Sequence, residues 1–134
     1  MEPREKMEYL QEYRKAERAV DRKMEEFDHW KERALRTNSI LGGARSSGIG
    51  DPTGNAVEKM VDLQREINGE IDHLVDVRKE IGACIRKVKD DNLELLLEYR
   101  YIDGRTWEDI AERMGYSYQH VNRLHKKALD NLPM

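Results

Sequence analysis

Apolar side chains recur at helical spacing in two long stretches of the chain. One stretch runs from about residue 5 to 36 and the other from about 56 to 89, and both alternate steps of three and four residues. Residues 37–55 between them lack this periodicity and contain five of the nine glycines and one proline. The pattern predicts two long helices, joined by a flexible loop, that fold back as an antiparallel hairpin.

Each long stretch has an apolar row that predicts which face of the helix is buried. A two-helix hairpin buries little apolar surface by itself, so we expect it to dimerise or to pack against the rest of the chain. In the first stretch the row is Tyr9, Tyr13, Ala16, Val20, Phe27, Trp30 and Ala34, with Lys23 at the position between Val20 and Phe27. In the second it is Val57, Met60, Ile67, Ile71, Leu74, Ile81, Ile85 and Val88, interrupted by Gln64 and Arg78.

The last 45 residues predict three short helices. Asp90, Asp91 and Asn92 interrupt the apolar row and can cap a helix over 93–101, and Asp103-Gly104 marks a turn after it. Thr106 can cap a second helix, Gly115 suits the left-handed residue that ends it, and Ser117 can cap a third helix over 117–132. Two capped helices with one glycine-containing turn between them predict a helix-turn-helix.

The expected fold class is therefore all-α, with a long antiparallel helical hairpin, or coiled coil, followed by a three-helix helix-turn-helix module. We expect two domains. Residues 1–89 form the hairpin with its flexible loop 37–55, and residues 90–134 form the module. The inward face of the last helix is predicted to be Val121, Leu124, Ala128 and Leu132.

The amino-acid composition limits which classes of protein are compatible with this sequence. Charged residues make up 38% of the chain, yet the formal net charge is −3, so any affinity for nucleic acid must come from a local patch. The single cysteine, Cys84, excludes an internal disulfide and a multi-cysteine zinc site. The chain has neither an apolar signal segment at its start nor an apolar run of membrane-spanning length, which predicts a soluble, cytoplasmic protein.

The C-terminal motif resembles a known family. The residues that carry the resemblance are Thr106, Glu108, Ile110, Glu112-Arg113-Met114-Gly115, Ser117, Val121 and Lys127-Ala128-Leu129. Together with the upstream run LLLEYRYIDGRTWEDIA, they resemble the last region of bacterial sigma factors, which reads the promoter's upstream element. The whole chain also resembles small phage transcriptional regulators of the ArpU and RinA kind. The resemblance implies double-stranded DNA as a partner and RNA polymerase as a further one.

In a helix-turn-helix the second helix lies in the major groove. The outward residues of 117–132 are Tyr118, Gln119, Asn122, Arg123 and Lys126. Asn and Gln can pair with adenine, and Arg with guanine. The first four occupy positions where the resembled sigma region contacts bases, but sigma factors typically place Arg, Glu, Arg and Gln there, which leaves the recognised sequence open.

Further residues near this helix are candidates for phosphate contacts. They are His120, His125, Lys126, Lys127 and Arg105, with the backbone amides at Thr106 and Ser117. Acidic residues on the preceding helix, Glu108, Asp109 and Glu112, would oppose such contacts because they repel the backbone of DNA.

Two classes of function are not favoured. The four histidines lack the spacing of a metal site, and we find neither a Ser-His-Asp nor a Cys-His arrangement, so we expect no metal, no cofactor and no enzyme activity.

The main hypothesis is a sequence-specific DNA-binding transcriptional regulator of phage or prophage type that dimerises through its hairpin. The alternatives are a DNA-packaging protein like a phage terminase small subunit, or a helical interaction protein without DNA binding.

Overall fold

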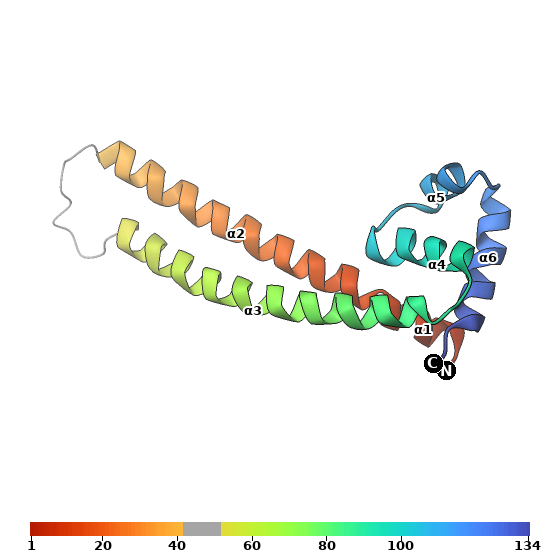
Figure 1. The fold of residues 1–134 in the computed structure, drawn as a ribbon. Coiled ribbons are helices and arrows are strands. Elements are labelled where there is room, and N and C mark those ends of the chain that lie inside the picture. Colours follow the sequence, from red (N-terminus) through yellow and green to blue (C-terminus); the bar gives the residue numbers. More distant parts are fainter. Residues whose placement is uncertain (42–51) are drawn as a thin grey trace. The chain divides into compact units, whose positions relative to one another are not determined.

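The structure, a computed structural model, describes residues 1–41 and 52–134. Within these ranges every regular element is a helix (Figure 1). The chain forms two compact units. The first is made of Met1–Glu17 and Leu74–Met134, and the second lies within Arg18–His73. The predicted all-α fold class is confirmed.

Three helices form the hairpin, namely α1 (Pro3–Leu10), α2 (Glu12–Leu41) and α3 (Pro52–Arg86). Helices α2 and α3 run antiparallel, as predicted (Figure 1). Helix α2 continues to Leu41 and α3 begins at Pro52, so both ends of the predicted loop are helical, whereas α3 ends at Arg86, before the predicted end at residue 89. Proline is well tolerated in the first turn of a helix, which explains the start of α3. The loop prediction for residues 42–51 lies outside the described residues.

The first predicted helix is interrupted once, at Gln11. Its N–H donates to the Met7 carbonyl at 2.9 Å, and its own carbonyl accepts from the Lys15 N–H at 3.0 Å. Backbone hydrogen bonding therefore continues across the break between α1 and α2. Leu10, just before the break, is fully buried.

The buried row on α3 differs in part from the predicted one. Ile67, Ile81 and Ile85 are buried as predicted, but Val57 and Ile71 are 47% and 40% exposed, so their predicted burial is wrong. Apolar residues occupy neighbouring positions on this helix, and periodicity alone does not select which row faces the partner helix. The buried apolar residues of α3 are Ala56, Leu63, Ile67, Val77, Ile81 and Ile85.

The unit within Arg18–His73 has a thin core. Among its described residues, only four apolar side chains are buried, namely Val20, Ala56, Leu63 and Ile67. An ion pair between Lys23 Nζ and Glu66 Oε2, at 3.1 Å, joins α2 to α3. This pair is solvent-exposed and contributes little to stability, so the few buried apolar side chains hold the two helices together.

The other unit contains the C-terminal helices. They are α4 (Asp91–Leu97), the π-helix η1 (Glu98–Ile102), α5 (Trp107–Met114) and α6 (Tyr118–Asn131). The predicted helix 93–101 spans α4 and η1, and its change to π-helical hydrogen bonding was not predicted. Asp90 caps α4 as predicted, since its Oδ1 accepts from the N–H groups of Asn92 and Leu93, both at 3.0 Å.

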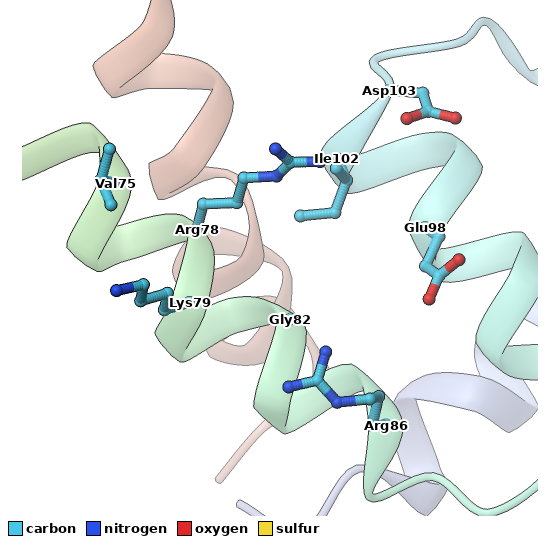
Figure 2. Close-up of a pocket in the computed structure, with 8 residues that line it drawn as sticks. All are labelled: Val75, Arg78, Lys79, Gly82, Arg86, Glu98, Ile102 and Asp103. Atoms are coloured by element: carbon cyan, nitrogen blue, oxygen red, sulfur yellow. The ribbon is translucent and has the colours of Figure 1, made fainter. Parts of the chain in front are cut away.

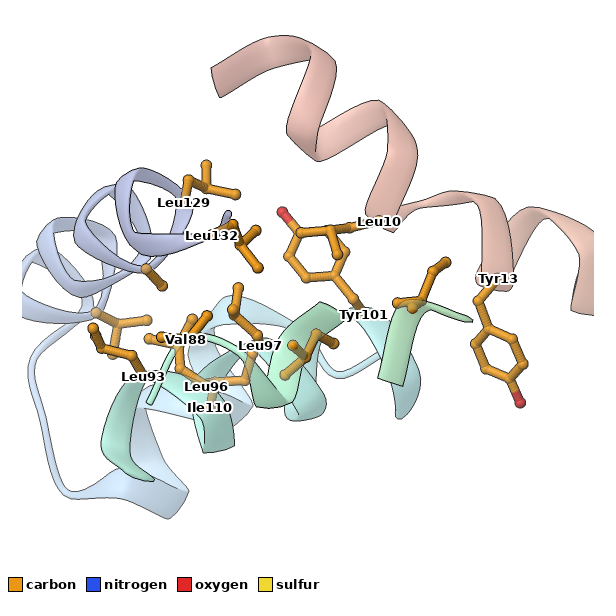
Figure 3. Close-up of a cluster of buried hydrophobic side chains, with 14 of the residues drawn as sticks. Leu10, Tyr13, Val88, Leu93, Leu96, Leu97, Tyr101, Ile110, Leu129 and Leu132 are labelled. Atoms are coloured by element: carbon orange, nitrogen blue, oxygen red, sulfur yellow. The ribbon is translucent and has the colours of Figure 1, made fainter. Parts of the chain in front are cut away.

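The core of this unit draws on both ends of the chain (Figure 3). Leu10 from α1 and Ile81 and Ile85 from α3 are buried in the same cluster as apolar residues of the C-terminal helices. The compact unit is therefore larger than the predicted module 90–134. Fully buried members of the cluster include Leu10, Leu93, Leu96, Leu97, Ile110 and Val121.

In the described part of the chain, the helices are too polar or too short in their apolar stretches to cross a membrane.

Candidate nucleic-acid interface

Helices α5 and α6 begin and end at the residues that the sequence predicts. Thr106 Oγ1 accepts from the Asp109 N–H at 3.1 Å, and Ser117 Oγ accepts from the His120 N–H at 3.1 Å, so each helix has a side-chain N-cap. Gly115 has a φ of 73°, and the Tyr116 N–H donates to the Ala111 carbonyl at 3.0 Å. These are the features of a glycine-terminated helix, and they hold α5 and α6 in the predicted helix-turn-helix.

Helix α6 has one buried and one solvent-facing side. Val121, Ala128 and Leu132 are buried as predicted, and Leu124 is half-buried. The predicted base-contacting residues lie on the other side, where they follow one another at helical spacing. Tyr118, Gln119, Arg123 and Lys126 are exposed, and Asn122 is half-buried.

The phosphate candidates fall into two groups. Lys126 and Lys127 are exposed, and the exposed Thr106 and Ser117 stand at the start of α5 and α6, where backbone N–H groups are free to bind an anion. His120 is half-buried, with its ring 4.6 Å from the ring of Tyr116. Arg105 and His125 form the second group, because each contacts other side chains of the protein.

Arg105 belongs to a partly exposed cluster of charged side chains. Its Nη1 donates to Asp109 Oδ2 at 3.1 Å, and its guanidinium also lies 5.3 Å from the ring of Tyr99. Arg113 Nε donates to the same Asp109 oxygen at 3.2 Å. The hydrogen bond from Arg105 is the main cause that lowers the pKa of Asp109. The charge of Asp109, which the sequence suggests would repel DNA, is therefore compensated by two arginines.

The prediction that His125 meets phosphate is wrong, because this side chain is only 7% exposed. Its Nε2 is 2.7 Å from the hydroxyl of Tyr101, and its ring centroid lies 4.6 Å from that of Trp107. Burial lowers the pKa of His125 to about 4, and the nearby Arg100 acts in the same direction. At neutral pH the imidazole is therefore uncharged and belongs to the core behind α6.

Sequence reasoning missed Lys6, a buried side chain that supports α6. Its Nζ donates to the carbonyls of Leu129 and Leu132, at 2.7 and 3.1 Å. These carbonyls lie at the C-terminal end of α6, where a helix leaves acceptors without partners and favours positive charge. The sequence shows only that Lys6 lies four residues before Leu10, on the same face of the helix. No local pattern reveals that its partner lies 123 residues away.

A cavity of about 560 Å³ lies elsewhere in this unit, between α3 and η1 (Figure 2). Arg78, Lys79 and Arg86 line its α3 side, and Glu98 and Asp103 line the other side. Burial is the main cause that raises the pKa of Glu98. None of the predicted DNA-contacting residues lines this cavity, so it is separate from the exposed face of α6.

Comparison with known proteins agrees with this geometry. Residues 90–132 match the family model "Sigma-70, region 4". Over 78 residues the chain is 30% identical to the RNA polymerase sigma factor SigO of Bacillus subtilis strain 168. This match covers 58% of the chain but only 41% of the relative's length.

The matched region begins at the cap of α4 and ends after α6, so it contains the helix-turn-helix and the helices that support it. No solved structure matches the chain significantly. The resemblance to ArpU and RinA regulators has no counterpart in these matches and stays a prediction. Residues 90–132 form a helix-turn-helix module like region 4 of the sigma-70 factors.

Proposed function

We propose that the protein is a sequence-specific DNA-binding regulator of transcription that reads the major groove with α6. The match to sigma-70 region 4 and the sigma-factor relative support a DNA-binding, transcription-related role. The observation that carries the proposal is the exposed polar side of α6, where Tyr118 is 48% exposed and Gln119 and Arg123 are also accessible. The opposite side of the same helix is anchored in the core.

Side-chain chemistry divides this surface into base-reading and phosphate-binding parts. Gln119 and Asn122 carry amides that suit adenine, and Arg123 carries a guanidinium that suits guanine. Lys126, Lys127 and the amides at the starts of α5 and α6 suit phosphates, which position the protein without reading the sequence. Because His125 is buried and Arg105 is paired with Asp109, the phosphate-binding part is smaller than the sequence suggests.

Regulation of promoters by a phage or prophage protein fits this arrangement. The name of the matched relative, an RNA polymerase sigma factor, supports RNA polymerase as a second partner for this chain. We further propose that the protein acts as a homodimer through its helical hairpin, since a helix-turn-helix dimer reads two half-sites one helical turn apart.

Selection of bound duplexes from a random DNA pool tests the proposal. We expect an enriched sequence, and a dissociation constant on that duplex that rises steeply as salt increases, because bound phosphates release counterions. The slope should correspond to a few phosphate contacts. A pool that shows no enrichment, or an affinity that does not change with salt, would show that α6 does not dock in a groove.

A further inference from the structure

A second row of side chains runs along α3 beside the row that packs against α2. Val57, Val61, Gln64, Asn68 and Ile71 are separated by alternating steps of four and three residues, the spacing of a coiled-coil seam. We call these five residues the outer row. All of them are exposed, Val61 by 52%. The outer row has the periodicity of a buried surface, yet no described residue of its own unit covers it.

The thin core of this unit gives a physical reason for the outer row to be covered. Only four apolar side chains are buried among the described residues of Arg18–His73. Helices of this kind are stabilised mainly by packing of their apolar faces, so two helices with so small a core are marginal alone. A partner that covers the three aliphatic side chains of the outer row would supply burial that the hairpin lacks.

The middle of the outer row is polar. Gln64 Nε2 donates to Asn68 Oδ1 at 3.0 Å, so two amides occupy consecutive positions of the seam. A polar residue in a coiled-coil seam costs stability but specifies the register and the number of helices. The pair of amides therefore suits a partner that presents amides at the same level and aliphatic side chains on both sides of them.

A second copy of α3 meets this requirement in the antiparallel direction. When Gln64 of one copy lies opposite Asn68 of the other, Val61 lies opposite Ile71, and the reverse contacts form by symmetry. Apolar residues then meet apolar residues and amides meet amides. A surface that pairs with itself in this way is the kind found in two-fold symmetric dimers.

The position of α2 also favours the antiparallel direction. The outer row lies roughly 110° around α3 from the row that faces α2, given about 100° per residue in an α-helix. A two-fold axis perpendicular to α3 places both α2 helices on the same side of the α3 pair, which closes a four-helix bundle. An axis parallel to α3 would place them on opposite sides and leave the bundle open.

We propose that the protein forms a homodimer in which the outer rows of two α3 helices pack antiparallel. This assigns a surface and an orientation to the homodimer of the proposed function, and it does not depend on DNA binding. The partner is a second copy of the chain, recognised through Val61, Gln64, Asn68 and Ile71.

The mass of the full chain in solution, measured by light scattering over a range of concentrations, tests the surface. We expect a dimer, and Val61→Glu should raise its dissociation constant about tenfold or more because it buries a charge in the seam. Lys59→Glu is the matched control, since Lys59 is exposed on the same helix away from the outer row. At a protein concentration at which both variants are dimeric, circular dichroism should show equal helix content, because both positions are exposed within a single chain.

Cysteine cross-linking tests the orientation. In a Cys84→Ala background, a Val61→Cys chain mixed with an Ile71→Cys chain should form a disulfide between the two. Neither chain alone should do so, because Val61 of one copy is far from Val61 of the other in the antiparallel pair. A Val61→Cys chain that cross-links to itself would overturn the antiparallel arrangement.

Other outcomes would overturn the surface. They are a monomer at every concentration, a ring of eight or more copies, or a dimer that Val61→Glu does not weaken. DNA binding, measured separately, distinguishes the two proposals. A monomer that binds its selected duplex leaves the proposed DNA-binding role intact and removes the dimer. A dimer that binds no duplex removes the DNA-binding role and leaves the dimer intact.

Discussion

At the scale of single residues, Lys6 and His125 show how α6 is held from behind. Lys6 is 7% exposed and donates to two carbonyls at the end of α6, and His125 is buried against Tyr101 and Trp107. Lysine and histidine side chains can both carry positive charge on a protein surface, yet both of these side chains are buried. The exposed side of α6 therefore depends on a support that comes in part from the start of the chain.

Replacing Lys6 with methionine should lower the free energy of unfolding by about 1–3 kcal/mol, the usual worth of hydrogen bonds to a charged group. The methionine side chain would fill a similar space but remove the Lys6 donor from the carbonyls of Leu129 and Leu132. The Leu129 carbonyl would keep only the Leu132 N–H at 3.2 Å, and the Leu132 carbonyl only the Met134 N–H at 2.9 Å. Urea denaturation followed by circular dichroism measures the loss. Lys15→Met, at a position on α2 outside the buried core, is the control and should change stability little. Equal effects of the two substitutions would show that the contact is not stabilising.

The burial of His125 predicts a loss of stability in acid. Its pKa is about 4 in the folded protein and about 6.5 when unfolded, so the unfolded state binds more protons between these values. Stability should be unaffected by this group above pH 6.5 and should decrease as pH falls towards 4, by about 2–3 kcal/mol at most.

His125→Gln separates this effect from carboxylate titration. Glutamine keeps a polar partner for the Tyr101 hydroxyl but does not titrate. The difference in melting temperature between the two proteins, measured from pH 7 to pH 4, should therefore shrink or change sign as the pH falls. A difference that stays constant across this range would mean that His125 is not held neutral.

Arg123 is the side chain on which specificity should depend most. Arg123→Ala should weaken binding to the selected duplex by about 1–3 kcal/mol, or about 5- to 150-fold, because a guanidinium pairs with guanine through two hydrogen bonds. Binding to unrelated duplexes should change much less. The control is Arg22→Ala, an exposed arginine of α2. A parallel loss on specific and unrelated DNA would place Arg123 on phosphate and not on a base.

At the scale of elements, local signals predicted structure better than periodic ones. The boundaries of α5 and α6 were predicted because Thr106, Gly115 and Ser117 act within three or four residues of their own position. The buried row of α3 was predicted only in part. Two neighbouring rows of α3 contain apolar residues. Which row is buried depends on the helix that packs against α3, and local sequence does not identify that helix. The contact of Lys6 with the end of α6 also depends on a distant part of the chain.

The turn between α5 and α6 depends on the backbone of Gly115. Its φ of 73° is strained for other residues, and a Cβ built there meets nothing within 4 Å. Gly115→Ala should therefore cost about 1–2 kcal/mol through conformation alone. Gly82 in α3 is the matched control in the same unit, because a Cβ there makes only an ordinary contact with Arg86. Gly82→Ala should stabilise by up to about 1 kcal/mol. Urea denaturation of both variants should give opposite signs.

At the scale of the whole molecule, the two ends of the chain build one unit. Met1–Glu17 and Leu74–Met134 share a core, whereas the sequence predicts a boundary between residues 89 and 90. Hydrophobic periodicity shows that each helix has a face to bury, but it does not show against which other face. The exposed side of α6 could be predicted because it is what remains after the inward face is assigned. The residues of α1 and α3 that pack behind α6 could not be predicted in this way.

A fragment of residues 90–134 should therefore be much less stable than the full chain. It retains the helix-turn-helix but lacks Leu10, Ile81 and Ile85, which are buried in the same core. Each such side chain contributes about 1.5–3 kcal/mol on full burial, so the loss should reach several kcal/mol. Thermal melting by circular dichroism should show a lower and broader transition for the fragment. A fragment that melts as cooperatively and at the same temperature as the full chain would show that the module holds α6 in place without α1 and α3.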